Sequence, residues 1–167
     1  HQARGGCRTC TKCVSSCPTK AIVANKIIDA RKCISYLTIE SKGVIPEALR
    51  PLLHNRIYGC DICQEVCPWN DTAQAKQMQS DWLEAALHRQ APPLVELAQL
   101  TEETFLERYQ GTPIMRAKRR GLLRNVAVAL GNWGSAEAGV ALEQLSQDQE
   151  ELVRDHALWG LRQVVRK

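Results

Sequence analysis

Eight cysteines are the residues best suited to chemistry in this 167-residue chain, and all of them lie between Cys7 and Cys67. They form two motifs joined by Cys33, which read Cys7-x2-Cys10-x2-Cys13-x3-Cys17-Pro18 and Cys60-x2-Cys63-x3-Cys67-Pro68. Cysteines at such short, regular spacing are typical of metal sites in a reducing compartment, whereas disulfide frameworks belong to oxidising ones. The first prediction is therefore a metal-binding module confined to the first 70 residues.

The first motif has the spacing with which bacterial-type ferredoxins hold iron–sulfur clusters, and in that spacing the fourth cysteine binds a second cluster. The apolar segments 21–24 and 27–29 flank a polar Asn25-Lys26 turn and predict a hairpin leading to Cys33. Residues 34–59 then interrupt the second motif as an insertion. Crossed ligation predicts two [4Fe-4S] clusters, one held by Cys7, Cys10, Cys13 and Cys67 and the other by Cys17, Cys33, Cys60 and Cys63. Two zinc sites are the alternative, although zinc seldom uses this motif.

A pair of clusters predicts one-electron transport toward an acceptor that these residues do not contain. The sequence has no Gly-x-Gly-x-x-Gly, Walker or His-Glu-x-x-His motif, so nucleotide and zinc-hydrolase chemistry have no support. His54, His88 and His156 each stand without partner ligands and are interpreted as surface or repeat residues. Trp69, next to Cys67-Pro68, is a candidate to shield a cluster from water.

The rest of the chain is predicted to be helical after a polar linker at 71–80. The first expected helix ends before Pro92-Pro93. Four more are expected, from Thr101 to Gly111, from Thr112-Pro113 to Leu130 before Gly131, from Ser135 to about Leu145, and from Asp148 to about Val165. Asp148 and Glu151 form a capping-box variant at the start of the last helix. Trp82, Trp133 and Trp159 fall at apolar helical positions and are expected in the core. Residues 123–127 (LRNVA) recur as 153–157 (VRDHA), which indicates a helix-pair repeat resembling short HEAT-like repeats.

Charge is distributed unevenly along the chain. Residues 1–80 contain 11 Lys+Arg and 6 Asp+Glu, and residues 81–167 contain 11 and 12, so that +5 and −1 give the net charge of +4. The helical half nevertheless holds an acid-free basic window, made of Arg116, Lys118, Arg119, Arg120 and Arg124. Such a window predicts a phosphate-binding surface, although basic helical residues are usually solvated. Arg124 is a candidate structural residue because Arg154 occupies the same place in the repeat.

Four segments in order, CRTCTKCVSSCPTKAI, KCISYLTIESKG, IYGCDICQEVCPWN and GTPIMRAKRRGLLRNVAVALGN, resemble epoxyqueuosine reductase. The resemblance implies a cobalamin-dependent enzyme with two [4Fe-4S] clusters that reduces epoxyqueuosine to queuosine at the tRNA wobble position. It also implies that this chain is the C-terminal part, lacks the N-terminal cobalamin-binding catalytic domain, and is inactive alone. The expected partners are tRNA and a flavodoxin or ferredoxin system. The protein is expected to be a cytoplasmic monomer that does not bind membranes, since no secretory signal or membrane span is evident.

The resemblance implies roles for particular residues. The cluster of Cys17, Cys33, Cys60 and Cys63 is expected to lie next to cobalamin, because the insertion leaves from Cys33 and returns at Cys60. Cobalamin and modified-base contacts are expected from Ser35, Tyr36, Thr38 and Glu40. Contacts to tRNA phosphates are expected from Lys42, Arg116, Lys118, Arg119 and Arg120.

The predicted fold class is α+β. A bacterial-ferredoxin-like two-[4Fe-4S] module at 1–70 carries a helical insertion at 34–59, the linker follows at 71–80, and an all-α HEAT-like repeat domain occupies 81–167. Three other functions remain open. They are a non-enzymatic electron carrier docked to a reductase through its helical tail, a nucleic-acid-binding module with structural clusters, and a reductive dehalogenase, against which the basic helical tail argues.

Overall fold

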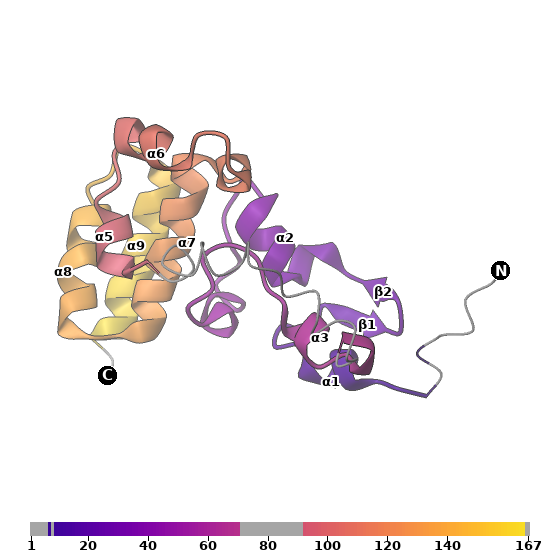
Figure 1. Cartoon of the computed structure of the whole chain (residues 1–167). Coiled ribbons are helices and arrows are strands. Elements are labelled where there is room, and N and C mark those ends of the chain that lie inside the picture. The colour runs from indigo at the N-terminus through magenta and orange to yellow at the C-terminus, as the bar shows by residue number, and fades with distance from the viewer. Residues whose placement is uncertain (1–6, 8, 71–91, 166–167) are drawn as a thin grey trace.

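The computed structural model describes residues 7, 9–70 and 92–165, and these form two lobes (Figure 1). The elements of the cysteine lobe are α1 Lys12–Ser16, β1 Ile22–Ala24, β2 Ile27–Ile28, η1 Ala30–Lys32, α2 Ile34–Ile39, η2 Arg50–Leu53, α3 Ile62–Glu65 and η3 Pro68–Asn70. Those of the helical lobe are α5 Leu94–Ala98, α6 Glu102–Tyr109, η5 Pro113–Arg116, α7 Lys118–Trp133, α8 Ala136–Leu145 and α9 Glu151–Val164. In the view of Figure 1, α2 lies between the hairpin and the helical lobe. The expected α+β fold class is confirmed at this level.

The predicted hairpin is present. Strands β1 and β2 pair antiparallel with Ile22 opposite Ile28, and Lys26 in the turn has a φ of +67°. The backbone N–H of Asp29 donates to the Ala21 carbonyl over 2.8 Å. Helix α1 packs against both β1 and α3, so the two cysteine motifs lie side by side next to the hairpin.

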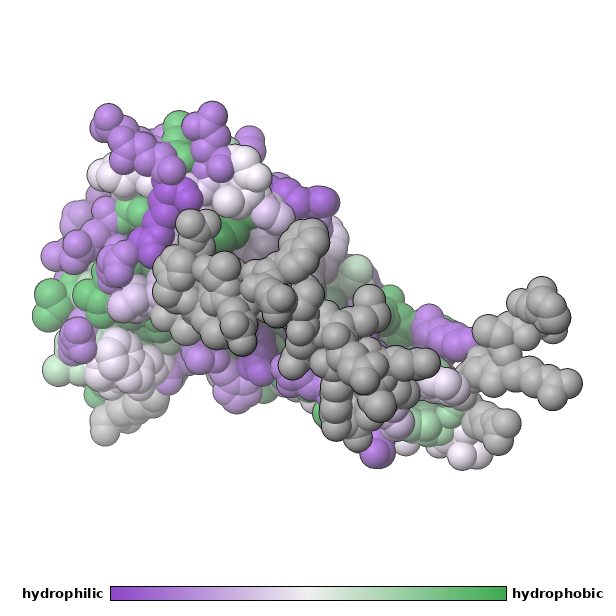
Figure 2. Space-filling view, in the orientation of Figure 1, coloured by the Kyte–Doolittle hydropathy of each residue, from purple (hydrophilic) through white to green (hydrophobic). Residues whose placement is uncertain are grey.

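The core of the helical lobe lies where α7, α8 and α9 meet. The residues repeated in the sequence supply much of it, because Leu123, Val126 and Ala127 of α7 are buried with Val153 and Ala157 of α9. Hydrophilic residues cover the end of this lobe near α6 (Figure 2). In the described ranges, no helix has the length and apolar character needed to cross a membrane.

Three tryptophans were expected in the core. Trp159 is buried there, which confirms the expectation, but Trp133 is 48% exposed and the expectation for it is wrong. Trp133 is the last residue of α7 and lines a surface cavity together with His54 and Leu94. Trp82 and the helix predicted around it lie outside the described residues, as do His88 and the linker at 71–80.

Two predicted helix starts are confirmed by their caps. The Thr101 hydroxyl accepts from the Thr104 backbone N–H, and the Thr104 hydroxyl accepts from the Thr101 N–H, which forms a capping box at α6. The Ser135 hydroxyl caps α8 by accepting from the backbone N–H of Ala138. Serine and threonine oxygens replace the missing backbone acceptors in the first turn, so these starts can be predicted from sequence.

Two other boundaries differ from the prediction. The expected helix from Thr112 to Leu130 is divided into η5 and α7, because Lys118 takes a left-handed φ of +60°. Helix α7 also continues past Gly131 and ends at Gly134, whose φ is +69°. A Cβ at Gly131 would lie 2.6 Å from the Cα of Gly160 in α9, so this glycine permits close helix packing and does not end the helix.

Asp148 does not cap α9 as expected. The helix begins at Glu151 with Glu150 as its N-cap residue, and no side chain caps it. The Asp148 carboxylate accepts instead from the backbone N–H of Glu150 and from the guanidinium of Arg119. The capping-box signal therefore identified a real turn but assigned its side chain the wrong partner.

The predicted insertion at 34–59 packs against the helical lobe. Ile34, Leu37, Ile45 and Leu53 are buried in one cluster with Val128 of α7 and Trp159 of α9. The segment thus shares a core with the helices as well as connecting Cys33 to Cys60.

Candidate metal centre

Four cysteines from three parts of the cysteine lobe surround one small apolar cavity. Cys17 follows α1, Cys33 precedes α2, and Cys60 and Cys63 lie at the start of α3. The side chains that complete the lining are mainly apolar, namely Pro18, Thr19, Ala21, Ile22, Ile28, Ile34 and Ile62. The structure therefore brings together the four cysteines predicted to share the second cluster.

The other four cysteines line a second cavity, which shares Ile22, Ile28 and Cys63 with the first. Cys7, Cys10, Cys13 and Cys67 are joined there by Cys63, which faces both cavities. Ile22, Ile28 and Trp69 supply apolar lining. Trp69 is 57% exposed, so it covers the edge of this cavity while remaining in contact with water.

The environment of Cys17 favours a thiolate. The backbone N–H of Ala21 donates to its Sγ over 3.2 Å, and the Thr19 hydroxyl lies 3.6 Å from the same sulfur. Burial would raise the pKa of the Cys17 thiol, but hydrogen bonds from Ile22, Thr19 and Ala21 outweigh it and hold the pKa below its usual value. Since the thiolate is the form that binds metals, Cys17 is prepared for ligation.

Cys63 has the opposite tendency. Burial raises the pKa of its thiol, and the neighbouring sulfurs of Cys60, Cys33 and Cys13 raise it further. Several thiolates this close repel one another unless cationic metal neutralises them. The site thus has the electrostatics of a ligand set that needs a positive centre.

All eight cysteines are half-buried and unpaired. Within the described ranges, no three His, Cys, Asp or Glu side chains converge on a position for a single metal ion. The thiols are gathered instead around two cavities separated by Cys63. Two groups of four soft sulfur ligands in apolar surroundings fit iron–sulfur clusters in number, type and environment.

The four polar residues predicted to touch cobalamin or substrate divide into two groups. Tyr36 is 42% exposed, and Ser35 and Glu40 are half-buried. Thr38 is fully buried, and its hydroxyl donates to the Ile34 carbonyl over 2.8 Å. A direct ligand contact by Thr38 is therefore wrong, because the insertion folds this hydroxyl inward.

Three predicted phosphate contacts form a surface group made of Lys42, Arg116 and Lys118. The Arg116 guanidinium lies 2.5 Å from the Glu40 carboxylate, and the Lys42 ammonium donates to the carbonyls of Ile39 and Arg116. Desolvation lowers the pKa of Lys42, as do the nearby charges of Lys118 and Arg116. These three cations share one surface at the junction between α2 and η5.

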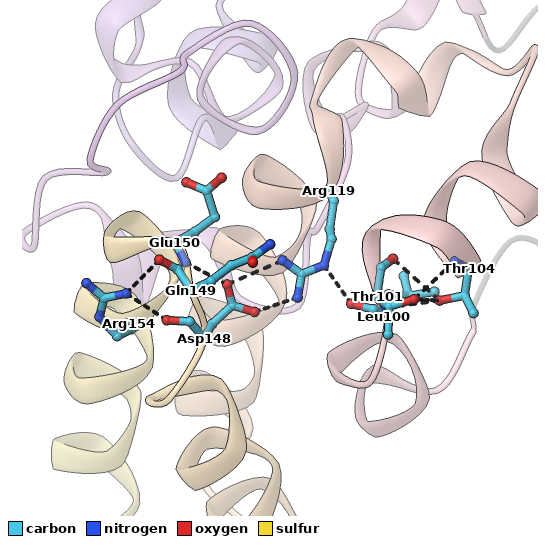
Figure 3. Close-up of polar contacts among 8 residues, drawn as sticks. All are labelled: Leu100, Thr101, Thr104, Arg119, Asp148, Gln149, Glu150 and Arg154. Atoms are coloured by element: carbon cyan, nitrogen blue, oxygen red, sulfur yellow. Dashed lines mark hydrogen bonds and ion pairs between the residues drawn. The ribbon is translucent and has the colours of Figure 1, made fainter.

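Arg119 does not belong to that surface. It is 8% exposed, its Nε donates to the Leu100 carbonyl over 2.7 Å, and its terminal nitrogens bind the Asp148 carboxylate (Figure 3). The prediction that Arg119 contacts tRNA phosphate is wrong, because α7 turns this side chain toward the loop before α9. Arg120, the next residue, is half-buried.

The structure also shows a polar contact region that the sequence only partly indicated. Arg124 and Asn125 are fully buried and bind backbone carbonyls of the insertion. His156 is buried too and accepts from the Ile45 backbone N–H. Arg124 is structural, as its place in the repeat suggested. Asn125 was missed because the repeat was interpreted as helix packing, yet a polar pair inside an apolar helical pattern was an available signal.

Comparison with known proteins agrees with this geometry. Residues 6–70 match a family model described as a 4Fe-4S double cluster binding domain. The chain is 44% identical over 161 residues to an epoxyqueuosine reductase of Aliivibrio fischeri and 47% identical over 165 residues to one of Alicycliphilus denitrificans, with 94% of this chain covered in each case. These alignments cover 42% and 45% of the two relatives.

Solved structures give the same result for the fold. An epoxyqueuosine reductase of Streptococcus thermophilus superposes with a TM-score of 0.82 at 29% identity, over 100% of this chain and 44% of that one. A crystal structure of epoxyqueuosine reductase with a tRNA-Tyr epoxyqueuosine-modified tRNA stem loop gives 0.78 at 32% identity, over 95% of this chain and 42% of that one. The chain thus spans less than half the length of the relatives it matches, and over that span it is similar in sequence and fold to epoxyqueuosine reductases.

Proposed function

We propose that this chain supplies the electron-relay part of a cobalamin-dependent reductase that converts epoxyqueuosine to queuosine at the tRNA wobble position. The observation that carries the proposal is the gathering of eight unpaired cysteines around two apolar cavities that share Cys63. When bound, two [4Fe-4S] clusters supply single-electron transfer toward cobalamin. We assign the catalytic domain to the part of the relatives that this chain does not cover.

The ligands in this proposal are the two crossed sets. Cys7, Cys10, Cys13 and Cys67 hold one cluster, and Cys17, Cys33, Cys60 and Cys63 hold the other. Hydrogen bonds from Ala21 and Thr19 stabilise negative charge on the Cys17 sulfur, and the isoleucines around the second set exclude water. Such neighbours influence both ligand orientation and reduction potential.

The exposed side of α2 is the proposed contact with cobalamin and the modified base. Tyr36 and Ser35 reach the surface directly after Cys33, so a group bound there lies close to the second cluster. Glu40 is partly neutralised by Arg116. The buried Thr38 has a supporting role in place of a contact.

The proposed RNA contacts are Lys42, Arg116, Lys118 and Arg120. The first three share one surface, and a similar protein has been crystallised with a modified tRNA stem loop. Lys118 is exposed, and its backbone takes a left-handed φ of +60° at the start of α7. Phosphate contacts of this kind add affinity that falls with salt and is independent of base sequence.

The remaining parts of the proposal concern organisation. We place a ferredoxin-like domain at 1–70, a linker at 71–80 and a HEAT-like repeat domain at 81–167, on the support of the shared core of α7 and α9. A flavodoxin or ferredoxin system supplies electrons to a cytoplasmic monomer.

Reconstitution of the full 167-residue chain with iron and sulfide tests the proposal. We expect about eight iron atoms per chain from two cubanes and an electron paramagnetic resonance signal from interacting reduced clusters. Binding of unmodified tRNA at two salt concentrations is measured on the same sample, with a random RNA duplex as the control. Uptake of zinc alone would eliminate every redox function. Reducible clusters with no preference for tRNA would favour the plain electron carrier.

A further inference from the structure

The end of helix α2 is completed by three side chains, two of which come from α7 of the helical lobe. This six-residue helix starts directly after Cys33, and its last four carbonyls have no partner within the helix. Tyr36 O accepts from the backbone of Glu40 over 2.9 Å. The other three carbonyls accept from side chains, which are Arg124 at 2.6 Å for Leu37, Asn125 at 2.9 Å for Thr38 and Lys42 at 3.0 Å for Ile39. Residues of α7 therefore supply two of the three side-chain bonds at the C-terminal end of this short helix.

Asn125 joins this helix to the chain segment that returns to the metal centre. Its Nδ2 donates to the Thr38 carbonyl over 2.9 Å and to the Ile57 carbonyl over 2.8 Å. Its Oδ1 accepts from Nε and Nη2 of Arg124 over 3.0 and 2.9 Å. Every donor and acceptor of the buried amide is used, so its position is fixed.

The Thr38 hydroxyl makes a second connection between the same two segments. It accepts from the backbone N–H of Gly59 over 2.9 Å while donating to the Ile34 carbonyl over 2.8 Å. Gly59 directly precedes Cys60, and its φ of +82° directs the chain into α3. The segment after Cys33 and the segment before Cys60 are thereby tied together at two points.

We propose that Asn125 and Thr38 are positioning residues that fix the separation of Cys33 and Cys60 and thereby tune one cluster selectively. The inference depends on the proposed function, because it requires that these cysteines hold a cluster. Both tied segments lead to cysteines of the second set, whereas Cys7, Cys10, Cys13 and Cys67 lie on neither segment. Through Asn125 the helical lobe controls the cluster placed closest to the substrate surface.

The test compares Thr38→Val, Thr38→Ser and Asn125→Ala in the full chain after reconstitution. Valine has the shape of threonine without the hydroxyl, and serine retains it. Because outer-shell partners typically change metal affinity by 10–100-fold, we expect Thr38→Val to weaken iron retention at one cluster about 10-fold against a chelator. The midpoint potential of that cluster should shift while the other stays unchanged. Asn125→Ala should act in the same direction, and Thr38→Ser should behave as the unsubstituted chain.

Leu145→Ala is the matched control for general loss of stability. Leu145 is buried in the core of the helical lobe, in α8, and belongs to neither tied segment. It should lower the melting temperature without a selective effect on one cluster. Two results would overturn the inference while leaving the proposed function intact. The first is that Thr38→Val loses both clusters equally, as Leu145→Ala does. The second is that the midpoint potentials stay unchanged in both Thr38→Val and Asn125→Ala. An unsubstituted chain that takes up no cluster would overturn both.

Discussion

The imidazole Nε2 of His156 in α9 accepts a hydrogen bond of 3.0 Å from the backbone N–H of Ile45, 111 residues earlier in the chain. Its Nδ1 lies 2.7 Å from the Leu152 carbonyl, so the ring is neutral with its proton on Nδ1. Protonation of Nε2 would break the bond that joins the insertion to the helical lobe.

This arrangement predicts a stability that falls in mild acid. Desolvation lowers the pKa of His156 to about 4, against about 6.5 in the unfolded chain. The unfolded state therefore binds more protons between these values, and stability is lost as pH falls from about 7 toward 4. We expect a loss of about 2 kcal/mol between pH 7 and pH 5 from this residue. Urea unfolding of the metal-free chain at the two pH values measures it.

The comparison that isolates His156 uses two substitutions. His156→Gln should flatten the pH dependence between pH 7 and 5, because the titrating ring is gone. His54 is exposed, so His54→Gln should leave the slope as it was. A slope that persists in His156→Gln would assign the acid sensitivity to other groups.

The contact between α7 and α9 gives a second prediction. Gly131→Ala would place a methyl group 2.6 Å from the Cα of Gly160, and backbone cannot move aside as a side chain can. We expect a loss of about 1–3 kcal/mol in the free energy of unfolding, typical of overpacking. Gly139→Ala in α8 is the control, since its methyl group would lie 3.6 Å from Val164 Cγ1 in ordinary contact. That change should stabilise the protein by up to about 1 kcal/mol through helix propensity.

Part of the arrangement of the cysteines was predictable because its information is local. The spacing of Cys7, Cys10, Cys13 and Cys17 and the hairpin that follows depend on short-range chain geometry. The caps at Thr101 and Ser135 are local for the same reason. In each of these places a few neighbouring residues determine the structure.

The errors concern residues whose partners are distant in sequence. Arg119 and Arg120 are adjacent and equally basic, yet Arg119 meets Asp148, 29 positions further along the chain. Thr38 is predicted as a ligand contact from its sequence position alone. Its hydrogen-bond partner Gly59 lies 21 positions away, so the sequence does not show that this hydroxyl is already used. Burial of a polar side chain depends on what the fold brings opposite to it, and periodicity alone does not contain that information.

The Arg119–Asp148 pair leads to a third prediction. Both side chains are nearly buried, with 10% and 7% of their area exposed. Arg119→Ala would leave the Asp148 carboxylate without its guanidinium partner and the Leu100 carbonyl without its donor, so we expect a loss of about 3 kcal/mol in the free energy of unfolding. Lys118→Ala, at an exposed neighbouring position, should change it by less than about 0.5 kcal/mol. Equal effects in denaturant titrations of the two variants would contradict the structural role of Arg119.

For RNA binding we expect the opposite ranking of these two variants, with Lys118→Ala having the larger effect and Arg119→Ala the smaller one. Each phosphate contact releases counterions, so removing one should reduce the slope of log affinity against log salt by about 1. Lys118→Ala should show this reduction with unmodified tRNA, because its ammonium is exposed beside Lys42 and Arg116. Arg119→Ala, measured at a temperature where it remains folded, should keep the full slope because its guanidinium is held by Asp148. Titrations at 50 and 200 mM salt, roughly the range over which such contacts are lost, separate the two outcomes. A slope that falls only in Arg119→Ala would place the RNA on the other side of α7.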